Sequence, residues 1–227
     1  MRSVVGDHCP AFSAVAVAGG DAVFVRQEGK GIPLRSSDGR LVLYLQAKFN
    51  CRFSAMHDYL KVERSSFSVF PALDETPAEP VVRYDFNEDP VGDVPAAHVQ
   101  FHGSHRGLEA VLAVSGDSTR RGRRRRRAAD RGDAMHIHRL HFPVGGRRFR
   151  PALEDVLEML IVEFGISHVE GSREAIADER EHWRRIQLRA AVADAPEVAV
   201  QELERRGYVV DNSKADRVGS PNRMREA

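Results

Sequence analysis

The stretch Leu41-Val-Leu-Tyr-Leu-Gln-Ala-Lys-Phe49 places Leu41, Leu43, Leu45 and Ala47 at every second position. Side chains alternate between the two faces of a strand, so these four residues share one face. The sequence Ser36-Ser-Asp-Gly39 precedes the stretch, and Asp-Gly before an apolar run is typical of a turn. The stretch therefore predicts a strand with one buried face.

Other short segments extend this strand into a sheet. They are rich in β-branched or aromatic residues or alternate apolar with polar ones, and they cover residues 22–26, 60–70, 81–86, 97–102 and 135–142. The chain shows no regular alternation of strands with helices and no glycine-rich phosphate loop, which argues against a doubly wound nucleotide fold. We expect a mostly antiparallel sheet of four to six strands.

The last third of the chain predicts three helices. Pro151 fits a first helical turn, and Gly165 fits the C-terminal cap of the same helix. The residues between them form an apolar stripe at helical spacing: Leu153, Val156, Leu157, Leu160, Ile161 and Phe164. A second helix is expected over 172–192, with Trp183 and Ile186 in the core. A third begins at a capping box, Asp194-Ala-Pro-Glu197, and an edge strand follows at 208–210.

Together these elements predict an α+β fold in which the three C-terminal helices pack on one face of the sheet. Residues 1–35 have many glycines and no clear period, so we expect an irregular segment there. An α+β core should follow over 36–165, then a helical extension over 166–210 and a frayed tail over 211–227.

Composition narrows the class of protein. The 227 residues are 42% hydrophobic and 30% charged, which is ordinary for a globular protein, and the net charge is +1. Cys9 and Cys51 are too few for a disulfide scaffold, so a cytoplasmic protein is expected. The small apolar run 11–18 suggests a signal peptide as an alternative, but Asp7 and Pro10 argue against it. No apolar run has the length of a transmembrane helix, so no membrane partner is expected.

Residues 115–134 differ from the rest of the chain because they hold eight arginines and no apolar residue larger than alanine. We expect a disordered insertion or flexible loop. Clustered arginines bind phosphates, so RNA or DNA is one candidate partner. An acidic protein is another, and a simply solvated loop from a GC-rich, actinobacterial gene is the third interpretation.

Six of the ten histidines fall in two segments, 98–105 and 136–141. His98 and His102 share one side of their expected strand, and His136 and His138 share one side of theirs. If the strands pair, up to four imidazoles line one surface. Three interpretations stay open: acid–base chemistry near neutral pH, a metal site such as zinc, or exposed polar residues without a function.

Two groups of charged residues lie near these histidines in the sequence. Arg83, Tyr84 and Asp85 occupy a neighbouring strand, where they are candidates to bind phosphate and orient an imidazole. Arg147 and Arg148 precede the first C-terminal helix, whose N-terminus favours anions. This corner is either a phosphate site or an ordinary strand-to-helix turn.

The order of these segments resembles the TumE-like toxins of bacterial toxin–antitoxin loci over about residues 57–164. The resembling parts are Tyr59-Leu-Lys-Val-Glu63, Val82-Arg-Tyr-Asp85, Pro95-Ala-Ala-His98 with His102 and His105, and Leu153-Glu-Asp-Val-Leu157. The resemblance implies action on RNA and an antitoxin-like protein partner, with Arg83, Asp85, His98 and His102 as the residues carried over. The family's members are shorter and lack the arginine-rich stretch and the last two helices.

The sequence thus predicts a toxin-like protein of a toxin–antitoxin or mobile-element locus, acting as a metal-independent ribonuclease. The expected catalytic residues are His98, His102, His138 and Asp85, and the expected substrate-binding residues are Arg83, Tyr84, His105, Arg147 and Arg148. His98 or His102 would activate the ribose 2′-hydroxyl and His138 would protonate the leaving oxygen. No cofactor and no metal ligand are expected in this interpretation. The alternative is a non-enzymatic protein that docks a partner through its helical last third.

Overall fold

The structure is a computed structural model. It describes residues 1–17, 20–54, 59–72, 79–107, 111, 119–133, 136–211, 213–215 and 219–225, and every structural statement below concerns these residues. The apolar segment 108–114, whose sequence is compatible with either a strand or a short helix, lies largely outside them.

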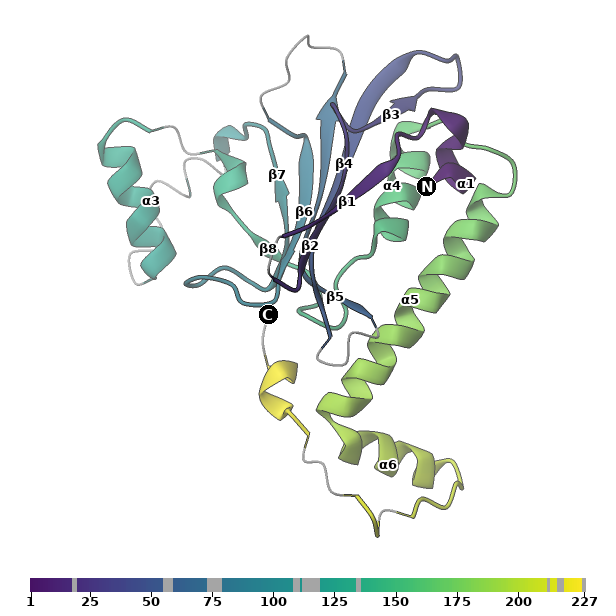
Figure 1. The fold of residues 1–227 in the computed structure, drawn as a ribbon. Helices are drawn as coiled ribbons and strands as arrows, with labels where there is room; N and C mark the ends of the chain where they lie inside the picture. The colour runs from purple at the N-terminus through teal and green to yellow at the C-terminus, as the bar shows by residue number, and fades with distance from the viewer. Residues whose placement is uncertain are drawn as a thin grey trace.

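One antiparallel sheet of eight strands forms the centre of the protein (Figure 1). Its order is β1-β2-β4-β5-β6-β7-β8, and β3 pairs with β4 beside β2. The bounds are β1 (Phe12–Ala16), β2 (Ala22–Gln27), β3 (Ile32–Arg35), β4 (Leu41–Phe53), β5 (Leu60–Pro71), β6 (Val82–Asn87), β7 (Ala97–Phe101) and β8 (Phe142–Pro143). The α+β class and the antiparallel sheet are therefore confirmed.

The strand count exceeds the expected four to six because residues 1–35 are not irregular. They contribute β1, β2 and β3 to the sheet, after the short helices α1 (Arg2–Val5) and η1 (Gly6–His8). Ile32 and Leu34 are at most 1% exposed, so β3 belongs to the core. The strand predicted at 22–26 is confirmed by β2, whereas β1 and β3 are held by pairing with β2 and β4, which no local period reveals.

The first two helices of the C-terminal third form a layer on one side of the sheet, and only the first of them packs directly on the strands. α4 (Leu153–Phe164) packs on the sheet, and Gly165 ends it in the left-handed conformation with φ of 60°, as expected. α5 (Ser172–Asp194) packs against α4 and α1 as an outer layer. α6 (Pro196–Arg205) has no buried residue and projects away from the sheet (Figure 1). The expectation of three helices on one face is wrong for α6.

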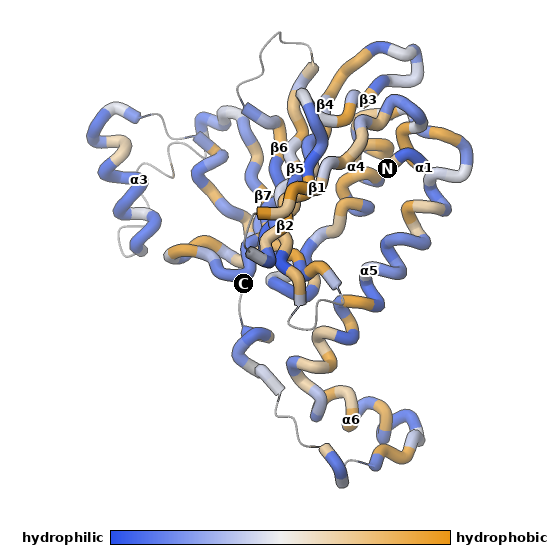
Figure 2. Tube along the Cα trace, in the orientation of Figure 1, coloured by the Kyte–Doolittle hydropathy of each residue, from blue (hydrophilic) through white to orange (hydrophobic). Residues whose placement is uncertain are grey.

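The hydrophobic core lies between the sheet and α4. Leu45, Val69, Val82 and Val99 come from four neighbouring strands, and Leu160 packs on them from α4. Figure 2 shows apolar residues concentrated where these strands and α4 meet. Among the described helices, none has the length and apolar character needed to cross a membrane.

A helix, α3 (Arg120–Asp130), occupies most of the arginine-rich stretch that we expected to be disordered or flexible. Arginine has high helix propensity, and the Thr119 side chain caps the helix by accepting from the Gly122 amide. Ala128 is 3% exposed and packs with Leu140, so alanine-sized residues suffice to dock this helix. Residues 115–118 and 134 lie outside the described part of the chain.

Three details of the C-terminal third differ from expectation. Asp194 does not cap α6; it ends α5 and binds Arg148, and Ala195 holds the N-cap position. Ile186 is 41% exposed because α5 packs on helices along only a narrow stripe. Residues 208–210 form no strand, and the expected frayed tail contains the short helix η3 (Pro221–Met224).

Candidate functional site

The face of the sheet opposite the core carries two rows of polar residues across four strands. Strand register places Gln46, Ser68, Arg83 and Gln100 side by side in the first row. It places Lys48, Ser66, Asp85 and His98 in the second row. Strand parity thus brings Arg83, Asp85 and His98 together, as expected from the sequence.

Arg83 joins the two rows through its guanidinium group. Its Nε donates to Asp85 Oδ2 at 2.6 Å, and its Nη2 donates to Gln100 Oε1. Gln100 is 5% exposed, and its Nε2 donates to the His138 carbonyl at 2.7 Å. Gln100 therefore fixes both the arginine and the segment that carries His138.

The His98 side chain is buried and oriented from both ring nitrogens. Nδ1 lies 3.0 Å from the Pro95 carbonyl, which can only accept, so Nδ1 carries the proton. Nε2 then faces Asp85 Oδ2 at 3.6 Å. Burial lowers the pKa of His98, although Pro95 and Asp85 oppose that shift. The imidazole is therefore neutral at pH 7, with Nε2 as its basic nitrogen.

His141 stands next to His98, with the ring centroids 4.5 Å apart. The Arg121 guanidinium of α3 hydrogen-bonds to His141 Nδ1. Burial, and then the positive charge of Arg121, lower the pKa of His141 to about 4. This histidine is therefore neutral at pH 7 and links α3 to the polar face of the sheet.

Two cation-lined cavities meet at His141. The first, of about 520 Å³, is lined by Lys48, Arg64 and Arg83 together with Asp85, His98 and His141. The second, of about 370 Å³, is lined by Gln100, Arg121, Arg124, Arg125, His138, Arg139 and His141. His141 lines both cavities, so a ligand that crosses from one to the other passes its ring.

A second group of imidazoles lies beyond Gln100. The rings of His102 and His138 stack with centroids 5.1 Å apart and an angle of 12°, and His136 stacks on His138 at 5.4 Å. The expected strand over 135–142 is wrong, because η2 (Ile137–Arg139) precedes the two-residue strand β8. The histidines still gather, since Gln100 holds the carbonyl of His138 beside β7.

Burial also lowers the pKa values of His102 and His138. Both ring nitrogens of His102 are buried, and neither has a hydrogen-bond partner among the described residues. The nearest carboxylate is that of Glu79, whose Oε2 lies 3.8 Å from His102 Nδ1, which is too long for a hydrogen bond.

The structure does not bring the other predicted substrate-binding residues into the cavities. Tyr84 packs against the core on the opposite face, where burial raises its pKa. His105 is exposed beyond the end of β7. Arg147 lies 3.8 Å from Glu88, and Arg148 forms a bidentate pair with Asp194 at 2.6 and 3.1 Å. The two arginines of the predicted phosphate corner therefore form ion pairs that connect parts of the fold.

Arg150 lies next to these ion pairs and packs against two aromatic rings. Its guanidinium lies 3.6 Å from the centroid of the Phe86 ring and 5.0 Å from that of Trp183. Burial lowers its pKa to about 10, so it keeps its charge at pH 7. Trp183, expected in the core, is half-buried and packs on this cation.

Sequence reasoning missed Gln100, Arg121 and Glu79 as parts of the site, and gave His141 no role. Gln100 had a usable signal, because it shares the strand parity of His98 and His102. Arg121 and Glu79 reach the site by tertiary packing of α3 and of the segment before β6, and no spacing in the sequence indicates it.

No protein-family model, curated protein or solved structure matches this chain. The resemblance to TumE-like toxins therefore stays a prediction.

Proposed function

We propose that this chain binds RNA on the polar face of its sheet and cleaves it by histidine chemistry, as a toxin-like protein of a toxin–antitoxin or mobile-element locus. The observation that carries the proposal is that His98 lines a cation-lined cavity, and that His141 beside it also lines a second one. A phosphodiester backbone suits such a surface because each of its phosphates carries one negative charge.

The charges of the second cavity support this choice of ligand. Four arginines and no acidic residue line it. The Nε atoms of Arg125 and Arg139 are buried without a hydrogen-bond partner among the described residues. Unpaired buried donors are costly, and phosphate oxygens would satisfy them.

The geometry of His98 supports a role as general base. Its neutral Nε2 would take the proton from a ribose 2′-hydroxyl, whose oxygen then forms a bond to the phosphorus. The bond to the leaving 5′-oxygen breaks, and that oxygen takes a proton from water. Asp85, 3.6 Å from Nε2, would stabilise the imidazolium, and Arg83 would bind the charged phosphate. No step needs a metal ion.

His138 is less suited to the acid role that the sequence suggested for it. Its pKa is lowered by burial, which leaves it neutral at pH 7, whereas a general acid should carry the second ring proton of an imidazolium. His102 lies beyond Gln100 and is not among the residues that line either cavity. The proposal therefore keeps Arg83, Asp85 and His98 and leaves these two histidines outside the reaction.

The test is cleavage of a labelled single-stranded RNA by the purified protein in the presence of EDTA. We expect His98→Ala to lose about 100-fold or more in rate, because general-base groups contribute on that scale. His182→Ala on α5 is the matched control, since His182 is exposed and far along the chain from the site. RNA that stays intact at high protein concentration, or cleavage that survives His98→Ala in a folded variant, contradicts the proposal.

A second candidate function is docking of a protein partner through the last two helices. α6 has no buried residue, and apolar side chains stay exposed along it and on α5, among them Leu188, Val198 and Leu203. An antitoxin-like partner would cover this surface. A Leu203→Glu variant should then lose a co-purifying partner while RNA cleavage is unchanged.

A further inference from the structure

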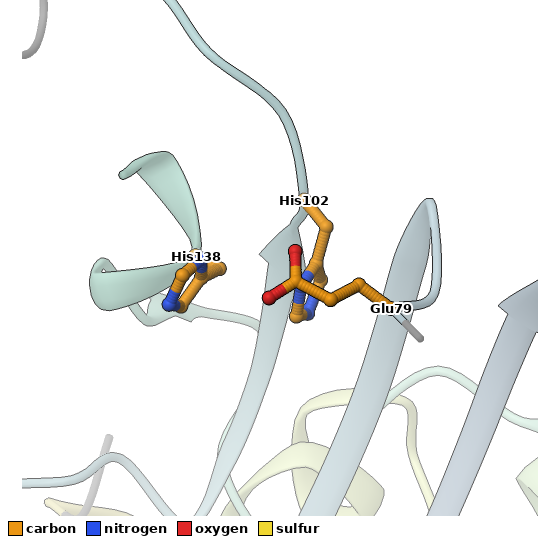
Figure 3. A group of neighbouring side chains, drawn as sticks. All are labelled: Glu79, His102 and His138. Carbon is orange, nitrogen blue, oxygen red and sulfur yellow. The ribbon is translucent and has the colours of Figure 1, made fainter. Parts of the chain in front are cut away.

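Glu79, His102 and His138 bring three metal-binding side chains together at one end of β7. One potential ligand atom from each residue lies within 4.8 Å of the other two. Figure 3 shows the Glu79 carboxylate extending toward the two imidazoles, which come from the end of β7 and from η2. Segments far apart in the sequence thus converge on one point.

The environment of His102 is unusual for a histidine without a ligand. Its side chain is 11% exposed, and both ring nitrogens are buried without a hydrogen-bond partner among the described residues. A buried polar atom without a partner is costly, and a neutral imidazole always has one nitrogen able to bind a metal. The position therefore favours a ligand that the described residues do not supply.

We propose that Glu79, His102 and His138 bind one zinc ion. Two imidazoles and one carboxylate are a donor set that zinc accepts, whereas magnesium and calcium prefer oxygen ligands alone. Tetrahedral zinc with bonds of about 2 Å needs its ligand atoms about 3.3 Å apart, so the three groups must close slightly. The Glu79 side chain is 63% exposed and has the freedom to do so.

Three protein ligands leave a fourth position open to water or to a small anion. Bound zinc would connect the segment before β6, the end of β7 and η2, and would hold His138 beside Gln100. This site goes beyond the proposed cleavage of RNA, which uses His98 and Arg83 and proceeds in chelator. The two proposals therefore fail independently.

The test is titration of the metal-free full-length protein with Zn²⁺, followed by calorimetry and by thermal unfolding. We expect one zinc ion per chain and a rise in melting temperature, with no comparable effect of Mg²⁺. His102→Ala should abolish the rise. Glu79→Gln, an exposed and conservative change, should weaken zinc affinity more than tenfold without affecting the fold.

His182→Ala is the control for weak, non-specific zinc binding by exposed histidines, because His182 is exposed on α5. This variant should bind zinc as tightly as the wild type. The proposal is overturned if Zn²⁺ leaves the melting temperature of the wild-type protein unchanged, or if folded His102→Ala and Glu79→Gln bind zinc as tightly as the wild type. Cleavage of RNA in EDTA by the same preparations reports separately on the proposed function.

Discussion

The two faces of the sheet are built from the same strands and differ in almost every property. Leu45, Val69, Val82 and Val99 point into the core, and α4 covers them. Their chain neighbours Gln46, Ser68, Arg83 and Gln100 point to the other side and form a polar row. Within it Arg83 donates to Gln100, which in turn donates to a backbone carbonyl of η2. A period of two thus separates the residues that stabilise the fold from those that can bind a ligand.

The largest effect should come from a matched pair of substitutions at neighbouring positions of β4. Leu45 is fully buried, so Leu45→Ala should lower the free energy of unfolding by about 3–4 kcal/mol through lost burial and a cavity. Gln46→Ala should change it by about 0.5 kcal/mol or less, because only a long hydrogen bond to Lys30 at 3.3 Å is lost. Urea unfolding measures both changes. Equal losses in the free energy of unfolding would contradict the difference between the buried and the polar face.

A smaller effect is expected where the helical layer is tied to the rest of the fold. Asp194 has a side chain 4% exposed and binds Arg148 from the link between β8 and α4. Asp194→Ala should cost about 2–3 kcal/mol, since it leaves a partly buried arginine without its carboxylate. The control is Glu181→Ala, which removes an exposed pair with Arg185 and should cost well under about 1 kcal/mol. Similar costs for both variants would show that the buried pair does not anchor α5.

The parts of the fold that the sequence predicts are those with a local physical signal. β4 to β7 show alternation or β-propensity, and α4 has an apolar stripe that ends at Gly165. β1 and β3 have no such signal, because pairing with other strands determines them. α3 differs from its prediction for another reason: its charged side chains predict solvation, whereas the helix propensity of arginine and the Thr119 cap favour a helix.

The candidate site follows the same division. Strand parity correctly placed Arg83, Asp85 and His98 on one face, because register acts over neighbouring residues. The same argument placed His138 on a strand, which is wrong, because His138 lies on η2. Glu79, Arg121 and His141 reach the site through loops and through α3, so only the three-dimensional structure shows their proximity.

The polar face should also make stability depend on pH. Folding lowers the pKa of His141 from about 6.5 in the unfolded chain to about 4 in the folded protein. The unfolded state then binds more protons below pH 6.5, so this stability is present at pH 7 and is lost as the pH falls toward 4. Allowing for solvent screening, about 1 kcal/mol should disappear between about pH 7 and pH 5.

Unfolding in urea at several pH values measures this loss. His141→Gln should flatten the dependence, while the core variant Leu45→Ala should lower stability equally at every pH. A wild-type protein that is as stable at pH 5 as at pH 7 would contradict the half-buried, neutral state of His141.

The smallest effect on folding is expected for Arg125→Gln in the second cavity. Arg125 Nε is buried without a hydrogen-bond partner among the described residues, so its removal deletes a cost and not a favourable contact. The free energy of unfolding should therefore stay within about 0.5 kcal/mol of the wild type or rise slightly. RNA affinity should nevertheless fall, and the slope of log affinity against log salt concentration should drop by about one, because one phosphate contact is lost.

Arg185→Gln on α5 removes the same charge far from the cavities and should leave that slope unchanged. If both variants weaken RNA binding equally, the chain's arginines attract RNA without a defined surface, and the polar face is not the binding site.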